Sequence, residues 1–340
     1  MTAKNQGAYL PAARANPLSV GLVDYPSVGD GEIIVKVAAA AVNPMDWFVQ
    51  IMGEKLFSWL KYPYTPGSDV AGVVVEVGPG VTRFKKGDRV VSLAAGFKSR
   101  NGGFQTYCAL STGLSSPIPE DLDFAKAAVL PLGLVTAAAG LFQKDHLGLD
   151  HPKVGGAPPN GKTVLIWAGS SSVGSNAIQL AAAAGYEVFT TSSPKNFDYC
   201  ERLGASRVFD YKSETIKEDL IRAFEGKTSA GGFAIQRGSE GITFEIIEKV
   251  EGNKFVTCAT PVPENKPEGV GAKFIFASTI KDNEVGPLIF ERFLPSALAK
   301  NAYHTAPLPH VVGSGLDKVQ EAYDLGKGGA TSAKKLVVTL

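Results

Sequence analysis

The chain has 340 residues, which is long for one domain and sufficient for two. Lysine and arginine number 34 and aspartate and glutamate 33, so the formal net charge of +1 gives no bulk attraction to nucleic acid or to an anionic membrane. Hydrophobic residues make up 44% and charged residues 20%, as in an ordinary globular protein. Global disorder, a collagen helix and a coiled coil are therefore excluded.

Three cysteines, Cys108, Cys200 and Cys258, lie far apart, which excludes a C-x-x-C pair and a four-cysteine zinc cluster. So sparse a set favours a reducing compartment, and the N-terminal residues lack the apolar region of a secretory signal. The uncharged stretch from Ala127 to Phe142 is short for a membrane span, and we expect a buried helix at a domain junction. We therefore expect a cytoplasmic protein that binds neither nucleic acid nor membrane.

The N-terminal part is rich in predicted β-strands. Residues 32–42 form a strand that ends at the chain-turning pair Asn43-Pro44. A valine-rich strand over residues 70–77 is closed by Gly78-Pro79-Gly80, and another short strand covers residues 89–92. Short strands separated by glycine and proline predict a partly open β-barrel.

From about residue 125 onward, predicted strands and helices alternate. Strands are expected over residues 163–167, 187–191 and 208–211, and helices over residues 172–184, 197–203 and 214–224. This alternation predicts an α/β fold with a doubly wound parallel sheet. Residues 334–340 read as one more strand, which we expect to return to the first domain.

A turn of small residues joins the strand that ends at Trp167 to the next helix; it consists of Gly169, Ser170, Ser171, Ser172, Val173 and Gly174. Its spacing matches G-x-G-x-x-G, except that serine replaces the middle glycine. Small residues let the backbone approach a pyrophosphate, and the helix N-terminus offers unpaired N–H groups. The sequence therefore predicts a dinucleotide site; the alternative is a tight turn without a ligand.

Cofactor choice depends on the end of the second strand of such a sheet, where an acidic residue would bind the ribose of NAD. This chain has Ser192, Ser193 and Lys195 instead, a set suited to the 2′-phosphate of NADP. Tyr211, at the end of the next strand, is expected to reach the same phosphate. The alternative is that Ser193-Pro194 only caps a helix and that Lys195 is solvated.

Four segments in order resemble the medium-chain dehydrogenase/reductase superfamily: NPMD (43–46), PYTPGSDVAG (63–72), FKKGDRV (84–90) and the turn described above. The resemblance is strongest to the zinc-independent quinone oxidoreductases, and SSPKNFD (192–198) is similar to fungal trans-acting enoyl reductases. It implies a GroES-like catalytic domain of residues 1–128 and 298–340 and a Rossmann NADP-binding domain of residues 129–297.

The same resemblance implies site residues. Zinc-dependent relatives place cysteine and histidine where this chain has Pro44 and Ser68, so we expect no metal. Asn43 matches an asparagine near the nicotinamide, Tyr64 a tyrosine that can donate to a carbonyl, and Thr136 a threonine that contacts the carboxamide. Each has a structural alternative: a turn cap, a core aromatic and a helix residue that bonds its own backbone.

Some positions depart from the relatives. Phe48 stands where some trans-acting enoyl reductases have lysine, and Gln236-Arg237 replaces an acidic pattern near the nicotinamide. The apolar segment of residues 47–62 is expected to line a substrate pocket or to belong to the core.

The resemblance implies an NADPH-dependent, zinc-free reductase of an activated C=C bond in an enone, quinone or enoyl thioester, with a role in polyketide or other secondary metabolism. The substrate would be small and apolar, free or bound to a carrier protein, and the enzyme a monomer or homodimer. Two hypotheses remain beside it: a non-redox isomerase or cyclase, and an NADPH-binding protein with little turnover.

Overall fold

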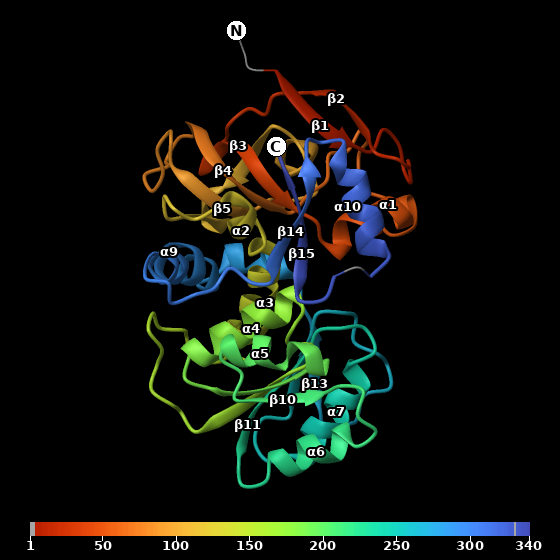
Figure 1. Ribbon diagram of the computed structural model, residues 1–340, viewed down its shortest axis with the longest axis vertical. Helices are drawn as coiled ribbons and strands as arrows, with labels where there is room; N and C mark the ends of the chain where they lie inside the picture. The colour runs from red at the N-terminus through yellow and green to blue at the C-terminus, as the bar shows by residue number, and fades with distance from the viewer. Residues whose placement is uncertain (1–3, 330) are drawn as a thin grey trace. The chain divides into compact units, whose positions relative to one another are not determined.

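The computed structural model describes residues 4–329 and 331–340. The chain forms two compact units, the first from residues 1–132 and 305–340 and the second from residues 133–304. Figure 1 shows the first unit built from the two ends of the chain, with red and orange N-terminal strands beside blue C-terminal strands.

The observed boundaries fall later than the predicted ones, which followed residues 128 and 297. Residues 303 and 304 stay with the second unit because they are bound to its helix α4 (Ser172–Ala183). Tyr303 donates its hydroxyl hydrogen to Asn176 Oδ1 at 2.7 Å, and the His304 backbone N–H donates to Gln179 Oε1 at 2.7 Å. The first unit therefore resumes only at Thr305.

In the first unit, the main sheet has the order β14-β15-β3-β4-β5-β7, and β6 also pairs with β3. One edge of β3 is shared, since its residues 39–41 pair with β15 and its residues 32–36 pair with β6. The predicted partly open barrel and the return of the C-terminal strand are confirmed. The strands are β3 (Glu32–Ala41), β4 (Asp69–Val77), β5 (Arg89–Leu93), β6 (Tyr107–Ser111), β7 (Ser115–Pro117), β14 (Leu308–Ser314) and β15 (Lys334–Thr339).

The described part of this unit also contains a separate antiparallel ribbon of β1 (Asn5–Tyr9) and β2 (Ser19–Val23) and the helices α1 (Pro44–Met52), α2 (Phe124–Ala128) and α10 (Lys318–Lys327). Helix α1 begins after Asn43, and the Asp46 carboxylate accepts the Asn43 backbone N–H at 2.7 Å. The Asp46 N–H in turn donates to the Asn43 carbonyl oxygen at 3.0 Å, and this reciprocal pair fixes where the helix starts, soon after the strand β3.

The sheet of the second unit is wholly parallel, with the order β10-β9-β8-β11-β12-β13. Because the chain moves outward from β8 in both directions, the strand order reverses between β8 and β11, which is the Rossmann arrangement. The predicted doubly wound sheet is therefore confirmed. Its strands are β8 (Lys162–Ile166), β9 (Glu187–Ser192), β10 (Arg207–Asp210), β11 (Thr228–Ala234), β12 (Phe255–Cys258) and β13 (Gly271–Phe274).

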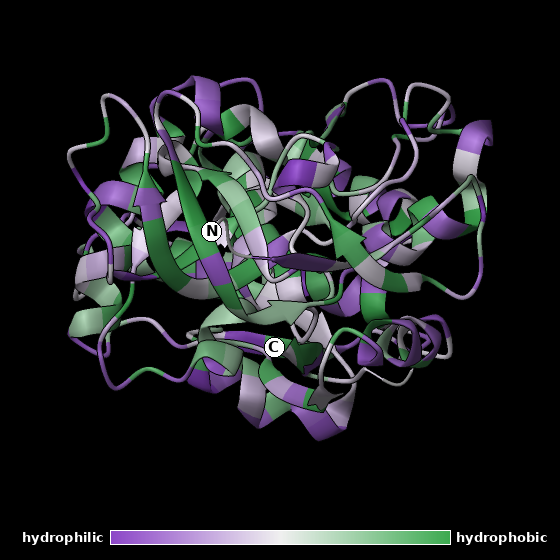
Figure 2. Cartoon of the chain, turned by 90° about the horizontal axis from the view of Figure 1, so that it is seen from above, coloured by the Kyte–Doolittle hydropathy of each residue, from purple (hydrophilic) through white to green (hydrophobic). Residues whose placement is uncertain are grey.

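Helices pack around this sheet, and its central strands are buried on both faces. Figure 2 shows hydrophobic residues concentrated in the strands and hydrophilic ones mainly in the loops and outer helices. The helices with the sheet are α3 (Pro131–Phe142), α4, α5 (Phe197–Arg202), α6 (Ile216–Ala223), α7 (Glu240–Lys249), α8 (Val285–Pro287) and α9 (Leu294–Ala299).

One helical stretch, Phe124–Phe142, is long and apolar enough to cross a membrane by length and composition alone. Of its most apolar 18 residues, 78% are buried within the protein. That burial is typical of a core helix, as the sequence predicted for residues 127–142.

Candidate functional site

The small-residue turn lies at the carboxyl end of β8, beside the point where the strand order reverses. At this turn two glycines leave no room for a side chain. A Cβ atom on Gly169 would lie 2.2 Å from Thr190 Oγ1, and one on Gly174 would lie 2.2 Å from the Ala168 carbonyl oxygen. Ala168 itself has a φ of 69°. The sequence thus folds here into a tight backbone loop against the first turn of α4.

Ser171, which stands in place of the middle glycine, is the N-cap of α4. Its Oγ accepts the Gly174 N–H at 3.0 Å and donates to the Ala168 carbonyl at 2.7 Å. The side chain thus satisfies one N–H of the helix terminus. Residues 170–173 keep partial exposure. A close backbone approach over a helix N-terminus fits a bound pyrophosphate.

The end of β9 lies beside this turn, because the Ser192 hydroxyl donates to Ser170 Oγ at 2.8 Å. Strand β10 pairs with β9, and the Tyr211 N–H donates to the Ser192 carbonyl at 3.4 Å. Lys195 is exposed, Ser193 is half-buried and the Tyr211 side chain is 43% exposed. Residues 189–197 contain no carboxylate. The predicted NADP residues therefore follow two adjacent strand ends, where β9 ends without an acid and Asp210 of β10 lies opposite Ser192.

Helix α3 carries Thr136 and packs against the start of α4. A Cβ on Gly133 would lie 2.5 Å from Ser172 Oγ, so the first turns of the two helices are in contact. Within α3 from Gly133 on, Thr136 alone keeps partial exposure. The structure thus places Thr136 about one turn of helix beyond Gly133, which contacts Ser172 of the small-residue turn.

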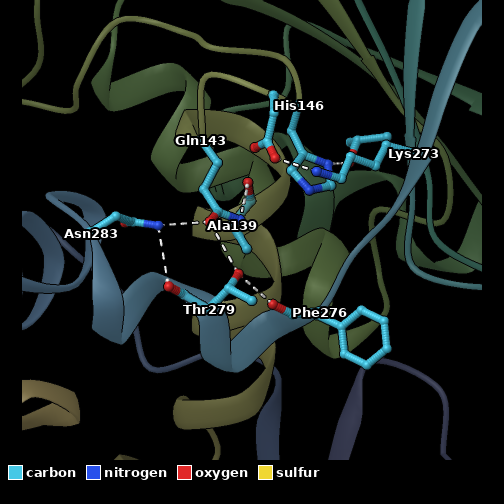
Figure 3. A network of polar contacts seen from close by, with 9 residues as sticks. Ala139, Gln143, His146, Lys273, Phe276, Thr279 and Asn283 are labelled. Carbon is cyan, nitrogen blue, oxygen red and sulfur yellow. Dashed lines mark hydrogen bonds and ion pairs between the residues drawn. The ribbon is translucent and has the colours of Figure 1, made fainter.

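The other end of α3 is held by the polar network in Figure 3. Gln143 Oε1 accepts from Thr279 Oγ1 at 3.0 Å and from Asn283 Nδ2 at 2.8 Å. Nearby, His146 Nδ1 lies 2.8 Å from Thr257 Oγ1 in β12, and burial lowers the His146 pKa. The Gln143 contacts tie the C-terminal end of α3 to residues 279–283, and the His146 contact ties the residues after α3 to the sheet. Burial keeps His146 neutral near pH 7.

In the first unit, a buried polar cluster surrounds Asn43. Lys335 Nζ donates to Asn43 Oδ1 at 2.6 Å and pairs with Asp69 Oδ2 at 2.9 Å. Asn43 Nδ2 donates to the same Asp69 oxygen at 2.9 Å. The other oxygen, Asp69 Oδ1, accepts the Leu132 N–H at 2.6 Å. Four segments of the first unit therefore meet at one carboxylate.

Asp46 is a second buried carboxylate beside this cluster. Burial raises its pKa to about 7, and the neighbouring Asp69 charge adds to the shift, whereas Lys335 and the bonds from Asn43 and Ser68 oppose it. The contact from Ser68 Oγ to Asp46 Oδ1 is long, at 3.4 Å. Near pH 7 both the protonated and the ionised forms of Asp46 are therefore populated.

Tyr64 is 6% exposed, and its hydroxyl has no hydrogen bond within the residues that the structure describes. Burial raises the Tyr64 pKa, and the Asp46 charge raises it further, which keeps the hydroxyl protonated. Tyr323 is fully buried and its hydroxyl is also unpartnered. A neutral phenol without an internal partner is suited to donate a hydrogen bond to a ligand.

The predicted site residues thus fall into two groups, with Asn43 and Tyr64 in the first unit and the remainder in the second. Asn43 follows β3 as predicted and is the N-cap residue of α1, and its side chain contacts Asp69 and Lys335. Sequence reasoning did not select Asp46, Asp69 or Lys335 as functional. The first two lie in the quoted motifs, whereas nothing in the sequence distinguishes Lys335 from Lys334.

No group of three His, Cys, Asp or Glu side chains in the described part of the chain could hold a metal ion. The absence of zinc stays a prediction. The three cysteines are buried and unpaired, and burial raises the thiol pKa of Cys200 to about 11 and of Cys258 to about 12. They are therefore poor nucleophiles.

The departures from the family pattern occupy defined places. Phe48 packs beside the first unit's core, with its ring centroid 6.2 Å from that of Phe57. In the segment of residues 47–62, Phe57 and Leu60 are core residues, whereas Trp59 is 63% exposed. The segment is thus partly core and partly surface. Gln236 and Arg237 are exposed in the turn after β11.

Comparison with known proteins agrees with this geometry. A family model described as the alcohol dehydrogenase GroES-like domain matches residues 29–120. Dehydrogenase pigH of Monascus ruber is 47% identical over 99% of this chain and 99% of its own length. Trans-enoyl reductase himH of Aspergillus japonicus is 37% identical over 99% of this chain and 97% of its own length.

Among solved structures, the quinone oxidoreductase of Pseudomonas syringae pv. tomato has a similar fold, with a TM-score of 0.77 at 20% identity. The match covers 99% of this chain and all of that one. At this identity the likeness establishes the fold alone.

Proposed function

This chain is an oxidoreductase of the medium-chain dehydrogenase/reductase superfamily, and on that basis we propose that it is an NADPH-dependent, zinc-free reductase of an activated carbon–carbon double bond. Members of this superfamily use a nicotinamide cofactor. The choice of NADPH rests on the end of β9, where Ser192 is bonded to the small-residue turn and Ser193 and Lys195 follow it in place of an acidic residue.

The cofactor residues would have separate tasks. The backbone from Gly169 to Gly174 would hold the pyrophosphate against α4, because neither glycine leaves room for a Cβ atom. Lys195, Ser193 and Tyr211 would bind the 2′-phosphate, with Ser192 holding the strand end to the turn through Ser170. Thr136 would bind the carboxamide.

Zinc-free chemistry is supported by the residues at the two positions where zinc-dependent relatives have ligands. Pro44 has no donor atom at all, and the Ser68 hydroxyl is turned toward Asp46 at 3.4 Å. The carbonyl of the substrate must then be polarised by hydrogen bonds.

When bound, the nicotinamide supplies the hydride for the β-carbon. The Tyr64 hydroxyl and the Asn43 amide would donate to the carbonyl oxygen as it gains negative charge. Burial of Tyr64 lowers the local dielectric and strengthens that donation. The proton for the α-carbon would come from a side chain or from water.

The proposed substrate is a small to medium apolar enone, quinone or enoyl thioester, free or on a carrier protein. The relative himH, named a trans-enoyl reductase, supports the enoyl class and a role in secondary metabolism. A cytoplasmic location and a monomeric or homodimeric state belong to the same proposal.

The test is NADPH consumption by the purified protein with a quinone, a simple enone and an enoyl thioester in parallel. We expect NADPH oxidation with at least one acceptor class and much slower oxidation of NADH. Dialysis against a chelator should not reduce the activity. NADPH binding without oxidation by any acceptor would contradict the reductase and favour a non-redox isomerase, a cyclase or a binding role. Loss of activity on chelation would instead contradict the zinc-free assignment alone.

A further inference from the structure

Lys335 is a buried lysine that contacts two groups of the polar cluster, Asn43 and Asp69. It lies 5% exposed in β15, at the C-terminal end of the chain, and its ammonium group contacts Asn43 Oδ1 at 2.6 Å and Asp69 Oδ2 at 2.9 Å. The adjacent Lys334 is exposed on the other face of the strand. Burial of a lysine is costly unless its charge is paired, so the position of Lys335 requires an explanation.

These contacts determine which way the Asn43 amide is turned. A lysine ammonium group can only donate hydrogen bonds, so the atom that faces it must be the amide oxygen. An ionised carboxylate can only accept, so the atom that faces Asp69 must be the amide nitrogen. Both assignments agree. In a flipped amide the NH2 group would face the Lys335 ammonium and the oxygen would face the Asp69 carboxylate, so neither hydrogen bond could form.

One of the two hydrogens on Asn43 Nδ2 is bonded to Asp69. The second has no acceptor among the residues that the structure describes, and Asn43 as a whole is 3% exposed. With the oxygen occupied by Lys335, this N–H is the remaining polar group of the side chain. Because a cation at the oxygen polarises an amide, the free N–H becomes a stronger donor.

We propose that Lys335 is a positioning residue that turns and polarises the Asn43 amide, so that its free N–H donates to the carbonyl oxygen of the substrate. The inference rests on the proposed reductase function, in which that oxygen gains negative charge. Lys335 itself does not touch the substrate. Asp69 completes the unit, since it balances the lysine charge and holds Asn43 Nδ2.

The obvious variant, Lys335→Met, leaves the Asp69 charge buried without a partner and is expected to lose stability. The double variant Lys335→Met/Asp69→Asn removes both charges and keeps an oxygen to accept the Leu132 N–H. Lys334→Met is the matched control on the neighbouring, exposed position. Asn43→Ala and Lys335→Met/Asn43→Ala show whether the lysine acts through Asn43.

For each variant, kcat, KM for NADPH and the thermal midpoint are measured. We expect Lys334→Met to match the wild type. The double charge variant should recover most of the thermal midpoint lost in Lys335→Met, while its kcat stays at least about 10-fold below wild type. Its KM for NADPH should change by no more than about threefold. Lys335→Met/Asn43→Ala should be no slower than Asn43→Ala.

A double charge variant that recovers kcat together with stability would show that the cluster is only structural. Independent, multiplicative losses from Lys335→Met and Asn43→Ala would also overturn the proposal. If Lys335→Met does not fold, the proposal is tested with Lys335→Met/Asp69→Asn alone.

The wild-type assay separates this proposal from the proposed function. If none of the tested acceptors supports NADPH oxidation by the wild type, the proposed reductase function is wrong. The orientation of the Asn43 amide is then tested by NMR. The side-chain N–H signals of Asn43, identified by their loss in Asn43→Ala, should move in the double charge variant and stay in place in Lys334→Met. Unmoved signals in the double charge variant would refute the positioning role without reference to activity.

Discussion

The backbone of Gly174 approaches the carbonyl of Ala168 so closely that a Cβ atom on residue 174 would lie 2.2 Å from that oxygen. The Gly174 N–H is held at the same time by Ser171 Oγ at 3.0 Å. The turn therefore cannot relax away from an added methyl group without losing its cap, and the nucleotide turn depends on this single close approach.

Gly174→Ala is expected to weaken NADPH binding by at least about 10-fold and to lower the free energy of unfolding by about 1–3 kcal/mol, because the clash is with backbone. Isothermal titration and urea unfolding measure the two effects. Gly241→Ala is the matched control, since nothing lies within 4 Å of its Cβ and it lies in α7. That change should raise stability slightly, as alanine does in helices. Equal behaviour of the two variants would refute the role of the close approach.

Lys195→Ala tests the choice of cofactor. Its exposed side chain is the cation next to Ser193 at the end of β9, so its loss should raise KM for NADPH by about 10-fold. KM for NADH, which lacks the 2′-phosphate, should hardly change. The control is Lys162→Ala, an exposed lysine at the opposite, amino end of β8. A parallel rise in KM for both cofactors would place Lys195 away from the 2′-phosphate.

Tyr64→Phe separates catalysis from stability. Its hydroxyl has no hydrogen bond to any described residue, so its removal should leave the free energy of unfolding unchanged or slightly raised. The loss of a donor to the developing oxyanion should lower kcat by about 100-fold. Steady-state kinetics and urea unfolding of the same preparation measure both quantities.

Tyr323→Phe is the control for that experiment, because its hydroxyl is also unpartnered but fully buried. It should keep the wild-type kcat and lose no stability. If Tyr64→Phe retains full kcat, Tyr64 is a core aromatic and the carbonyl is polarised by another group.

Asp46→Asn should change how stability depends on pH. Burial raises the Asp46 pKa to about 7 in the folded protein, whereas the unfolded chain has its ordinary value of 3.8. Between these values the folded state holds the proton that the unfolded state releases, so this group's contribution lowers stability as pH rises. An asparagine does not titrate and should remove that decline.

Urea unfolding at about pH 5 and about pH 8 measures the difference. Asp121→Asn, which changes an exposed carboxylate of the same unit, is the control for removing one negative charge. If Asp46→Asn loses stability with pH as steeply as the wild type, Asp46 does not hold the proton.

The candidate nucleotide site could be located from sequence because its parts are local. Gly169, Ser171 and Gly174 lie within one strand–turn–helix segment, and Lys195 follows the next strand. In a parallel sheet the carboxyl ends of adjacent strands meet at one edge, so the spacing alone brought these residues together. The fold was predicted for the same reason, whereas the later boundaries depended on contacts of Tyr303 and His304 with α4.

The polar cluster could not be predicted in this way. Asn43 and Lys335 are 292 residues apart, and Lys335 differs from Lys334 only in the face of β15 on which it lies. Which face is buried is set by the pairing of β15 with β3, where Val337 lies opposite Ala41. A shift of that register by one residue would exchange the two lysines.

The sequence by itself determined the two-domain α/β fold and the small-residue turn before α4. Both depend on hydrophobic periodicity and glycine positions, which act over short stretches of chain. Only the tertiary structure decided that Asp46 is buried, that the Tyr64 hydroxyl has no partner among the described residues, and that Lys335 contacts Asn43. The physical reason is that burial and ion pairing depend on which segments, distant in sequence, pack together in the same core. Charges that a sequence would place in water become strongly coupled there.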